Sequence, residues 1–287
     1  MRMHRIVRPA VIAAAAVTLV AGACSNNSSS STTSGSTGGF QGAPLNGAGS
    51  TFAQPLYQLW SQSFLQKEPD AQINYQPIGS GGGIEQFTAE TVDFGATDVP
   101  LQSDEIGNLP NQNYIEFPTA LGAVVFAYNV QGVDSGLKLD GKTISDIFLG
   151  NITKWNDPEI TGQNPGVNLP DEPIQTVHRS DESGTTAVWT GWLSAESSEW
   201  ASKVGADKAV QWPVGTGASG NDGVASGISQ TDGGAGYLSY DFAVTANLGV
   251  ADIKAPDGDY VAPSIDSISK AGGGLSFPIK SDTTIIN

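Results

Sequence analysis

Hydrophobic residues recur at intervals of three and four in the stretch that follows residue 51, and this spacing predicts an amphipathic helix. The apolar positions are Phe52, Leu56, Leu59, Trp60 and Phe64. Pro55 falls in the first turn, where its missing N–H is tolerated, so Ser50 or Thr51 is the expected N-cap. The small residues at 45–49 are expected to form a loop that leads into this helix.

Alternating and continuous apolar runs predict strands over the remainder of the chain. The expected strands are 73–78, 92–98, 114–117, 121–129, 174–177, 236–240 and 277–286. The expected helices are 84–87, 143–149, 158–160, 188–193 and 224–229. Glycine-rich loops are expected at 79–83 and 215–223. Strands and helices therefore alternate with short connections, which predicts an α/β fold with largely parallel sheets. The run 121–129 is nearly all apolar, as in a strand that is buried on both faces.

The first 23 residues have the pattern of an export signal. Three arginines precede a short apolar run, and small residues then lead to Cys24, the only cysteine. This arrangement resembles the lipobox of bacterial lipoproteins, in which the cysteine carries the lipid. Ala21 stands where that box most often has Leu, so the site of cleavage is an expectation. The alternative is a secreted protein with one unpaired cysteine.

Residues 24–43 are expected to tether the folded part to this anchor. Serine, threonine, asparagine and glycine fill most of the segment. Such residues bury too little apolar surface to offset the loss of chain entropy, so a flexible linker is expected. The layout predicts a protein held at the outer face of a bacterial cell membrane by its lipid alone.

The charge of the chain is strongly negative. Thirteen basic residues stand against 29 acidic residues, and removing Arg2, Arg5 and Arg8 with the signal leaves 10 against 29, a charge of −19. This balance argues against nucleic acid as a partner. It does not exclude a small anion, because exposed charges are screened beyond about 8 Å at physiological salt.

Two nucleotide-binding patterns occur in the sequence, and both lack the required context. Residues 136–143 match the P-loop pattern, but the intervening residues alternate like the edge of a strand. Residues 215–220 match the dinucleotide pattern, but Pro213 makes the preceding segment a poor central strand. Neither pattern is expected to bind a nucleotide.

Hydrolytic chemistry has little support in the sequence. His178 is the only histidine after the signal, no G-x-S-x-G motif occurs, and two S-x-x-K matches lack their companion motifs. One histidine and one cysteine cannot build a zinc site, and no calcium-loop pattern is present. No metal and no cofactor are therefore expected, although a secreted phosphate-ester hydrolase stays open as an alternative.

Residues 178–186 are the strongest candidate for a binding site. Arg179 is the only arginine after residue 23, and a planar guanidinium can hold a tetrahedral oxyanion through two parallel hydrogen bonds. Asp181 could orient this guanidinium. Ser183, Gly184 and Thr185 then supply hydroxyls and backbone N–H groups at an expected helix start, which is a common anion-binding arrangement. The alternative is a solvated surface ion pair.

Two further expected helix starts carry glycine with serine or threonine. They are 49–52, with Ser50, Thr51 and Phe52, and 79–81, with Ser80. Each alone is most often a simple cap. Three of them together with one solitary arginine suggest helix N-termini that converge on an anion.

Five motifs, in order, resemble the PstS-type phosphate-binding proteins, the extracytoplasmic receptors of phosphate ABC importers. The motifs are 47–52, 79–83, 92–98, 179–185 and 220–224. The resemblance implies a two-lobed periplasmic-binding-protein fold of type II, with phosphate in a cleft between two α/β lobes joined by a hinge. It implies lobe 1 at 44–123, lobe 2 at 124–276 and a return strand to lobe 1 at 277–287.

The resemblance also implies which residues bind phosphate. Position by position, these are Ser50, Thr51, Phe52, Ser80, Asp98, Arg179, Ser183, Gly184 and Thr185, with Asp181 orienting the arginine. Glu182 stands where many family members have glycine, and we expect it to face solvent. The implied partners are inorganic phosphate and a permease and ATPase complex, with the receptor acting as a monomer that performs no chemistry.

Asp98 carries the expected selectivity. Protonated phosphate can donate its O–H to this carboxylate, whereas sulfate at neutral pH has no proton to donate. A site built to pair a ligand hydroxyl can reject an analogue without it by roughly 10⁴–10⁵. A receptor for sulfate or molybdate and a non-functional surface antigen also stay open as interpretations of the sequence.

The sequence departs from the family at its end. Family members usually continue past the strand expected at 277–286 with helices that complete lobe 1, whereas this sequence stops at Asn287. The expectation is a truncated sequence or an incomplete first lobe.

Overall fold

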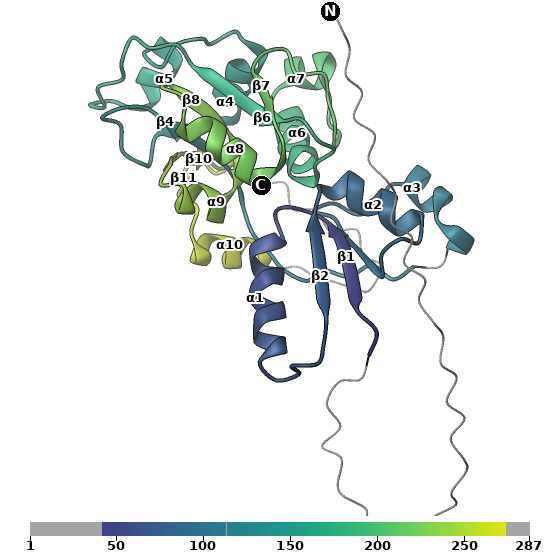
Figure 1. Cartoon of the computed structure of the whole chain (residues 1–287). Coiled ribbons are helices and arrows are strands. Elements are labelled where there is room, and N and C mark those ends of the chain that lie inside the picture. Colours follow the sequence, from purple (N-terminus) through teal and green to yellow (C-terminus); the bar gives the residue numbers. More distant parts are fainter. Residues whose placement is uncertain (1–41, 113, 274–287) are drawn as a thin grey trace, which may run out of the picture. The chain divides into compact units, whose positions relative to one another are not determined.

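The first sheet of the computed structural model, which describes residues 42–112 and 114–273, has three parallel strands. Strand β1 (Leu45–Gly49) lies between β2 (Ile73–Pro77) and β3 (Phe94–Ala96). Figure 1 shows β1 and β2 between helices α1 (Gln54–Leu65) and α2 (Ser80–Thr88). We call this sheet with its helices lobe 1.

The loop expected at 45–49 is wrong, because this segment is the central strand of lobe 1. Its small residues let other groups approach closely: a Cβ added at Gly47 would lie 2.0 Å from the Phe94 ring. At the end of the strand, Gly83 of α2 packs against Gly49, where a Cβ added at Gly83 would lie 2.4 Å from the Gly49 Cα. Glycine inside a strand often marks such a close approach.

Two loops expected from glycine runs are partly helical. Helix α2 begins at Ser80 and helix α8 (Gly220–Ser229) begins at Gly220, so the loops expected at 79–83 and 215–223 end earlier than predicted. Close packing of the glycines explains the difference, because tertiary contacts outweigh their low helix propensity.

The N-cap expected at Ser50 or Thr51 is also wrong. Helix α1 begins at Gln54, and its N-cap is Ala53, whose side chain makes no capping bond. Pro55 fixes this start because proline is tolerated only in the first turn. Ser50 Oγ instead accepts bonds from the N–H groups of Phe52 at 3.0 Å and Ala53 at 3.2 Å, in the turn before the helix.

The amphipathic helix predicted after residue 51 forms as α1. Much of its apolar face is not covered by the part of the chain that the structure describes. Leu59 is 58% exposed and Trp60 is 46% exposed. Tyr57 and Tyr75 meet edge to face beneath the helix, with ring centroids 5.2 Å apart. Helix α1 therefore contacts the sheet mainly through β2.

The strand expected at 114–117 does not form. After α3 (Ser103–Asn108) and a short 3-10 turn (Pro110–Gln112), residues 114–123 run outside any regular element. Ile115 is 69% exposed and Phe117 is 60% exposed, so their alternation with polar residues reflects no buried face.

The second sheet has five strands in the order β7-β6-β8-β4-β9. The strands are β4 (Val124–Asn129), β6 (Gln175–Arg179), β7 (Thr216–Ala218), β8 (Gly234–Ser239) and β9 (Gly249–Val250). Strand β6 is parallel to β7 and β8, but β4 is antiparallel to both of its neighbours. The prediction of largely parallel sheets is therefore wrong at β4, because an apolar run indicates burial and not strand direction.

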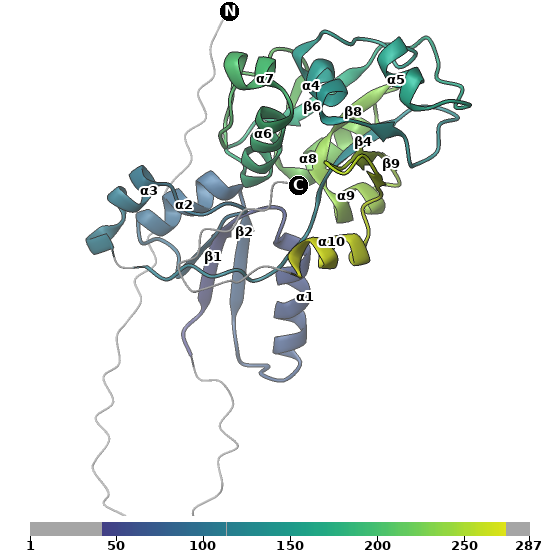
Figure 2. The ribbon, with the colours of Figure 1, turned by 180° about the vertical axis from the view of Figure 1, so that it is seen from behind.

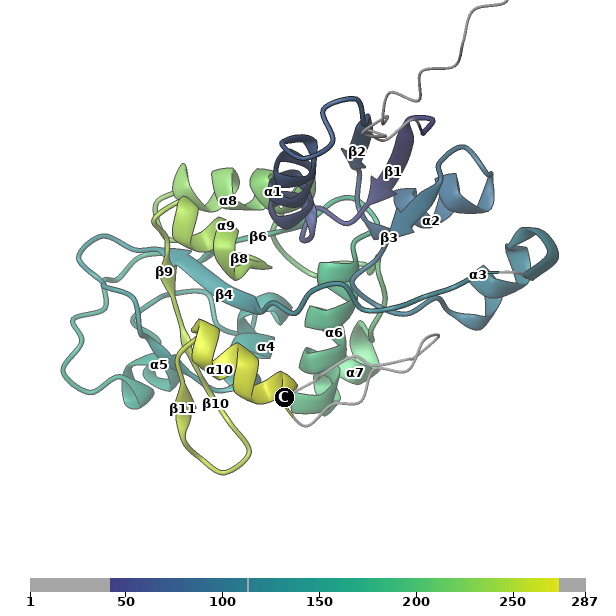
Figure 3. The ribbon, with the colours of Figure 1, turned by 90° about the horizontal axis from the view of Figure 1, so that it is seen from below.

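Strand β4 is buried on both faces, as predicted. Phe126 and Tyr128 contact one core with helices α4 (Gly141–Leu149), α6 (Gly184–Glu196) and α7 (Ser198–Lys203). Val125 and Ala127 contact a second core with α8 and α9 (Tyr240–Thr245). Figure 3 shows α8 and α9 on one side of β4 and α4 and α6 on the other.

The first of these cores is rich in aromatic rings. Trp212 stacks on His178 with centroids 4.9 Å apart and on Tyr237 with centroids 5.5 Å apart. Trp189 also stacks on Tyr237, with centroids 5.4 Å apart. The aromatic cluster therefore extends to the residue that precedes Arg179.

Short elements complete this part of the chain, which we call lobe 2 (Figure 2). They are β5 (Lys138–Leu139), β10 (Asp252–Lys254), β11 (Tyr260–Val261), α5 (Pro158–Gln163) and α10 (Ile265–Gly272). Strand β5 lies inside the P-loop pattern, and Asp140 caps α4 through Thr143 N at 2.8 Å. The pattern thus contains a strand edge, as expected, followed by a helix cap.

The chain therefore has a two-lobed α/β fold, as predicted. The predicted lobe bounds of 44–123 and 124–276 stay a prediction. The export signal, Cys24, the tether up to residue 41 and the strand at 277–286 lie outside the described residues. Within residues 42–273, apart from 113, no helix is long and apolar enough to cross a membrane.

Candidate functional site

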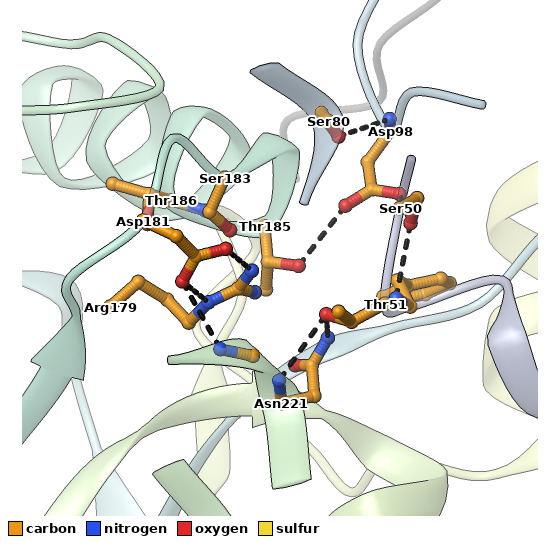
Figure 4. A network of polar contacts seen from close by, with 12 residues as sticks. Ser50, Thr51, Ser80, Asp98, Arg179, Asp181, Ser183, Thr185, Thr186 and Asn221 are labelled. Carbon is orange, nitrogen blue, oxygen red and sulfur yellow. Dashed lines mark hydrogen bonds and ion pairs between the residues drawn. The ribbon is translucent and has the colours of Figure 1, made fainter. Parts of the chain in front are cut away.

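Arg179 lies at the end of β6, and its side chain is 1% exposed. Its Nε donates to Asp181 Oδ1 at 2.7 Å, and its Nη2 donates to Asp181 Oδ2 (Figure 4). Asp181 also accepts a bond from the N–H of Gly220 at 3.1 Å. The arginine is therefore buried and its pair with the half-buried Asp181 is bidentate, which excludes the simple surface ion pair.

One edge of the guanidinium is left for a ligand. Arg179 Nη1 is buried and has no hydrogen-bond partner in the described part of the chain. An unpaired buried donor is costly, and more so when it carries charge. Arg179 therefore offers a charged N–H group that an anion could satisfy.

Asp98 follows β3 in lobe 1 and meets residues of both lobes. Its Oδ1 accepts the Ser50 hydroxyl, and its Oδ2 accepts the Thr185 hydroxyl at 3.0 Å. Its own N–H donates to Ser80 Oγ at 3.3 Å. Figure 4 shows Asp98 and Arg179 on opposite sides of Thr185, so an acceptor faces the donors.

The two carboxyl groups have opposite pKa shifts. Burial raises the pKa of Asp98 above its usual 3.8, and the Ser50 and Thr185 hydroxyls and the Arg179 charge offset this only in part. Burial also acts to raise the pKa of Asp181, but the hydrogen bond and charge of Arg179 outweigh it and lower that pKa. Asp181 is thus held ionised by the arginine that it orients.

Helix α6 supplies the lobe 2 donors. Ser183 is its N-cap, and Ser183 Oγ accepts from Thr186 N at 3.1 Å. Gly184 and Thr185 are the first two helical residues, so their N–H groups have no acceptor within the helix. Ser183, Gly184 and Thr185 are all buried. The structure therefore places the predicted lobe 2 residues together at one helix start.

The lobe 1 hydroxyls differ in what they can still donate. The Ser50 hydroxyl donates its proton to Asp98 and accepts a bond from the N–H of Phe52, so it is already used both as donor and as acceptor. Ser80 accepts from Asp98 N and keeps its own proton free. Thr51 and Ser80 are 3% and 1% exposed, so each presents a buried hydroxyl at the site. Thr51 and Ser80 are therefore the lobe 1 residues best placed to donate.

Asn221 is a site residue that the sequence analysis did not assign. Its backbone N and its Nδ2 donate to Thr51 Oγ1 at 3.2 and 2.8 Å, while its Oδ1 accepts from Ser239 N at 2.9 Å. Both acceptor positions of the Thr51 hydroxyl are thereby used, which leaves its proton to donate. The signal was present, because Asn221 lies in the fifth family motif.

Tyr237 was also missed. Its hydroxyl accepts from Arg179 N at 3.1 Å and contacts Thr186 Oγ1 at 2.6 Å. The side chain is fully buried in β8, and burial raises the pKa of its hydroxyl. The apolar pattern of this strand gives no sign of a polar role, so the sequence offered no signal for it.

The lobes touch directly around the site. A Cβ added at Gly184 would lie 2.5 Å from Ser80 Oγ and 2.7 Å from Asp98 Cβ. Gly81 N donates to the Glu182 carbonyl at 3.1 Å. Glu182 itself is exposed, as expected. Across residues 42–112 and 114–273 no group of acidic, histidine or cysteine side chains could hold a metal ion.

Comparisons with known proteins identify the family of the chain. A family model described as a PBP superfamily domain matches residues 26–283. The phosphate-binding protein PstS of Pasteurella multocida is 43% identical over 238 residues, which cover 83% of this chain and 68% of that protein. The chain belongs to the PstS family of phosphate-binding proteins.

Other PstS-related proteins cover similar parts of the chain. PstS of Xylella fastidiosa is 42% identical over 84% of this chain and 66% of its own length. The chain thus spans about two thirds of the length of these relatives. A solved structure described as a putative phosphate ABC transporter substrate-binding protein from Clostridium perfringens, with bound phosphate, superposes with a TM-score of 0.62 at 20% identity. The superposition covers 83% of this chain and 84% of the Clostridium perfringens chain, and it shows that the two share a fold.

Proposed function

We propose that this PstS-family chain captures inorganic phosphate between its lobes and delivers it to the permease of an ABC importer. The observation that carries the proposal is the buried Arg179 with its unpaired Nη1. Thr51, Ser80 and the first residues of α6 belong to the same network of polar contacts (Figure 4). Charge-assisted hydrogen bonds are about twice as strong as neutral ones, so they can offset the dehydration of the anion.

Asp98 supports phosphate over other tetrahedral anions. A buried carboxylate facing a ligand oxygen favours one that carries a proton, and phosphate keeps such a proton at neutral pH. Sulfate would bring a bare oxygen against Asp98 and suffer repulsion. In this proposal the phosphate O–H takes the place of the Thr185 hydroxyl or adds to it at Asp98 Oδ2.

The setting of the protein follows from the same proposal. PstS relatives and an ABC transporter substrate-binding protein share the fold, and the N-terminal pattern resembles a lipoprotein signal. The chain would act outside the cytoplasm as a monomer, anchored through lipidated Cys24, and would perform no chemistry. The membrane would be contacted through the lipid alone.

Calorimetry with phosphate and with sulfate on residues 25–287 tests the proposal. Phosphate is expected to bind, and sulfate is expected to bind at least about 1,000-fold more weakly, since the site pairs a ligand hydroxyl. Arg179→Lys is expected to weaken phosphate binding at least about tenfold, because an ammonium cannot reproduce the planar contact with both Asp181 and the anion.

Three results would count against the proposal. Equal affinity for both anions would remove the role of Asp98, and unchanged binding by Arg179→Lys would remove Arg179 from the site. Release of phosphate from a generic ester that follows the protein through purification would favour a hydrolase instead.

A further inference from the structure

An ion pair with a buried lysine also joins the two lobes. Lys208, in the loop after α7, is 5% exposed, and its Nζ lies 2.7 Å from Oε1 of Glu105 in α3 of lobe 1. The Glu105 side chain is 20% exposed. The other lysine pairs found in the described ranges lie within lobe 2, and their lysine side chains are at least 54% exposed.

Glu105 is fixed in place by its own helix. Its Oε2 accepts a bond from Gln102 N at 2.7 Å, which is one half of the capping box of α3. Its two oxygens therefore have separate tasks, because one caps the helix and the other meets the lysine. A carboxylate held in this way loses little additional side-chain entropy when the lobes come together.

Lys208 is fixed by the helix that begins the anion site. Its carbonyl accepts the N–H of Ser183, the N-cap of α6, at 3.0 Å. The preceding residue, Asp207, donates its N–H to Thr190 Oγ1 of α6 at 3.2 Å. The backbone of this loop is therefore attached to α6 at two points, one of which is the first residue of the lobe 2 donor set.

The ion pair depends on the relative position of the lobes. With the lobes together, the ammonium of Lys208 is removed from water and Glu105 is its partner. Movement of the lobes apart separates the charges and returns Lys208 to water. A buried pair is sensitive to the loss of one partner, because the remaining charge is left without compensation. In the closed arrangement either charge alone would be buried without its partner, so a change that removes one partner disfavours closure.

We propose that Glu105 and Lys208 form a closure latch that prolongs the residence of bound phosphate and keeps the Ser183 end of α6 in position. The inference rests on the proposed function, since it assigns these residues to the opening step of the same site. They are positioning residues, because neither touches the ligand. A contact that forms only on closure should slow ligand release more than it alters ligand capture.

Glu105→Gln is the sharpest test. Glutamine keeps one acceptor oxygen for the capping box of α3, and its NH2 group replaces the charged oxygen that meets Lys208, so the ion pair is lost while the cap can remain. The matched control is Glu199→Gln in α7, whose pair with Lys203 has a similar distance of 2.6 Å but is exposed and lies within lobe 2. Phosphate association and dissociation rates are measured by stopped flow for the wild-type protein and both variants.

The expected result is a dissociation rate about 10- to 100-fold faster for Glu105→Gln, with an association rate within about twofold of the wild type. Glu199→Gln is expected to match the wild type in both rates. Lys208→Met, which keeps the length of the side chain, should give the same effect as Glu105→Gln. The double variant should add nothing further, because each change removes the same interaction.

Three further outcomes test this inference, and the first two separate it from the proposed function. Phosphate binding by the wild type with equal dissociation rates for Glu105→Gln and Glu199→Gln would overturn the latch alone. Absence of phosphate binding by the wild type would overturn the proposed function and the latch with it. A fall in the unfolding temperature of Glu105→Gln without phosphate, with unchanged dissociation, would show a purely structural pair and also overturn the latch.

Discussion

Asp98 combines two properties that oppose each other. It provides the acceptor that distinguishes a protonated anion, yet its burial makes the ionised form unfavourable and raises its pKa. Because the pKa is higher in the folded state than in the unfolded state, the folded protein is penalised wherever Asp98 is ionised in both states. The penalty disappears as pH falls through the pKa of the folded state.

Asp98→Asn is therefore expected to raise the unfolding temperature of the phosphate-free protein at pH 7. A gain of about 1 kcal/mol would correspond to roughly 2–4 °C in a chain of this size. The gain should shrink toward pH 4, because the wild-type carboxyl then takes up a proton. Calorimetric unfolding at several pH values would measure it.

The matched control is Asp171→Asn, since the Asp171 side chain is 66% exposed and pairs with Lys154 at the surface. It should leave the unfolding temperature nearly unchanged at both pH values. A lower unfolding temperature for Asp98→Asn at pH 7 would contradict the assigned cost of burying this charge.

At the residue scale, the family resemblance predicted more of the site residues than the pattern of residue types could. Arg179 stood out from the sequence as the only arginine after residue 23, and in the structure it pairs with Asp181. Asn221 meets Thr51 across a separation of 170 residues, and Lys208 meets Glu105 across 103. Such contacts depend on how the lobes meet, so no local pattern could indicate them.

At the element scale, the site depends on how closely helix α6 approaches lobe 1. Gly184 is the first residue of α6 and lies against Ser80 and against the backbone of Asp98. A methyl group at this position would have no room while the lobes are in contact. Separation of the lobes would relieve the overlap without disturbing the fold of either lobe.

Gly184→Ala is therefore expected to weaken phosphate binding about 10- to 100-fold, because the added methyl group would overpack the contact between the lobes. The unfolding temperature without phosphate should change little, because the overlap arises only on closure. Calorimetry would give the affinity and scanning calorimetry the stability.

Gly162→Ala in α5 is the control, because an added Cβ there meets nothing within 4 Å. It should leave phosphate affinity unchanged and preserve or slightly raise stability, since alanine favours a helix over glycine. Unchanged affinity for Gly184→Ala would show that the lobe contact at α6 does not limit closure.

The elements that the sequence predicted best are those with continuous apolar runs. The strand at 121–129 and the helix at 143–149 correspond to β4 and α4, with bounds that differ by a few residues. The segment 45–49 was predicted as a loop because glycine and alanine have low strand propensity. Its strand character follows from pairing with β2 and β3 on both sides, which is a tertiary effect.

At the scale of the whole molecule, an anion receptor with a formal charge of −16, or −19 without the expected signal residues, must attract its ligand against its own field. The donors of the site are local, whereas the repulsion acts over the Debye length. That length falls from about 30 Å at 0.01 M salt to about 8 Å at 0.15 M.

The phosphate association rate is therefore expected to rise severalfold as sodium chloride increases over this range. The dissociation rate should change little, because the interactions that hold the anion are buried. Stopped-flow measurements at constant pH would separate the two rates. An association rate that falls with salt would show that a local positive field around Arg179 outweighs the charge of the surface.

The two-lobed architecture was predicted only through the resemblance to the PstS family. Composition and periodicity indicated an α/β protein but could not divide it into two lobes, because alternation of strands and helices is common to many such folds. Strand β4 is the first strand of the second sheet along the chain, and its apolar sequence likewise gave no indication of its antiparallel direction.

The stacked rings around Tyr237 have a practical consequence. Trp212 stacks on both His178 and Tyr237, and the Tyr237 hydroxyl contacts the backbone of Arg179. Indole emission responds to small changes in the polarity and geometry around the ring. The protein thus contains a natural optical reporter beside its proposed ligand, and its occupancy could be followed by light without attaching a dye.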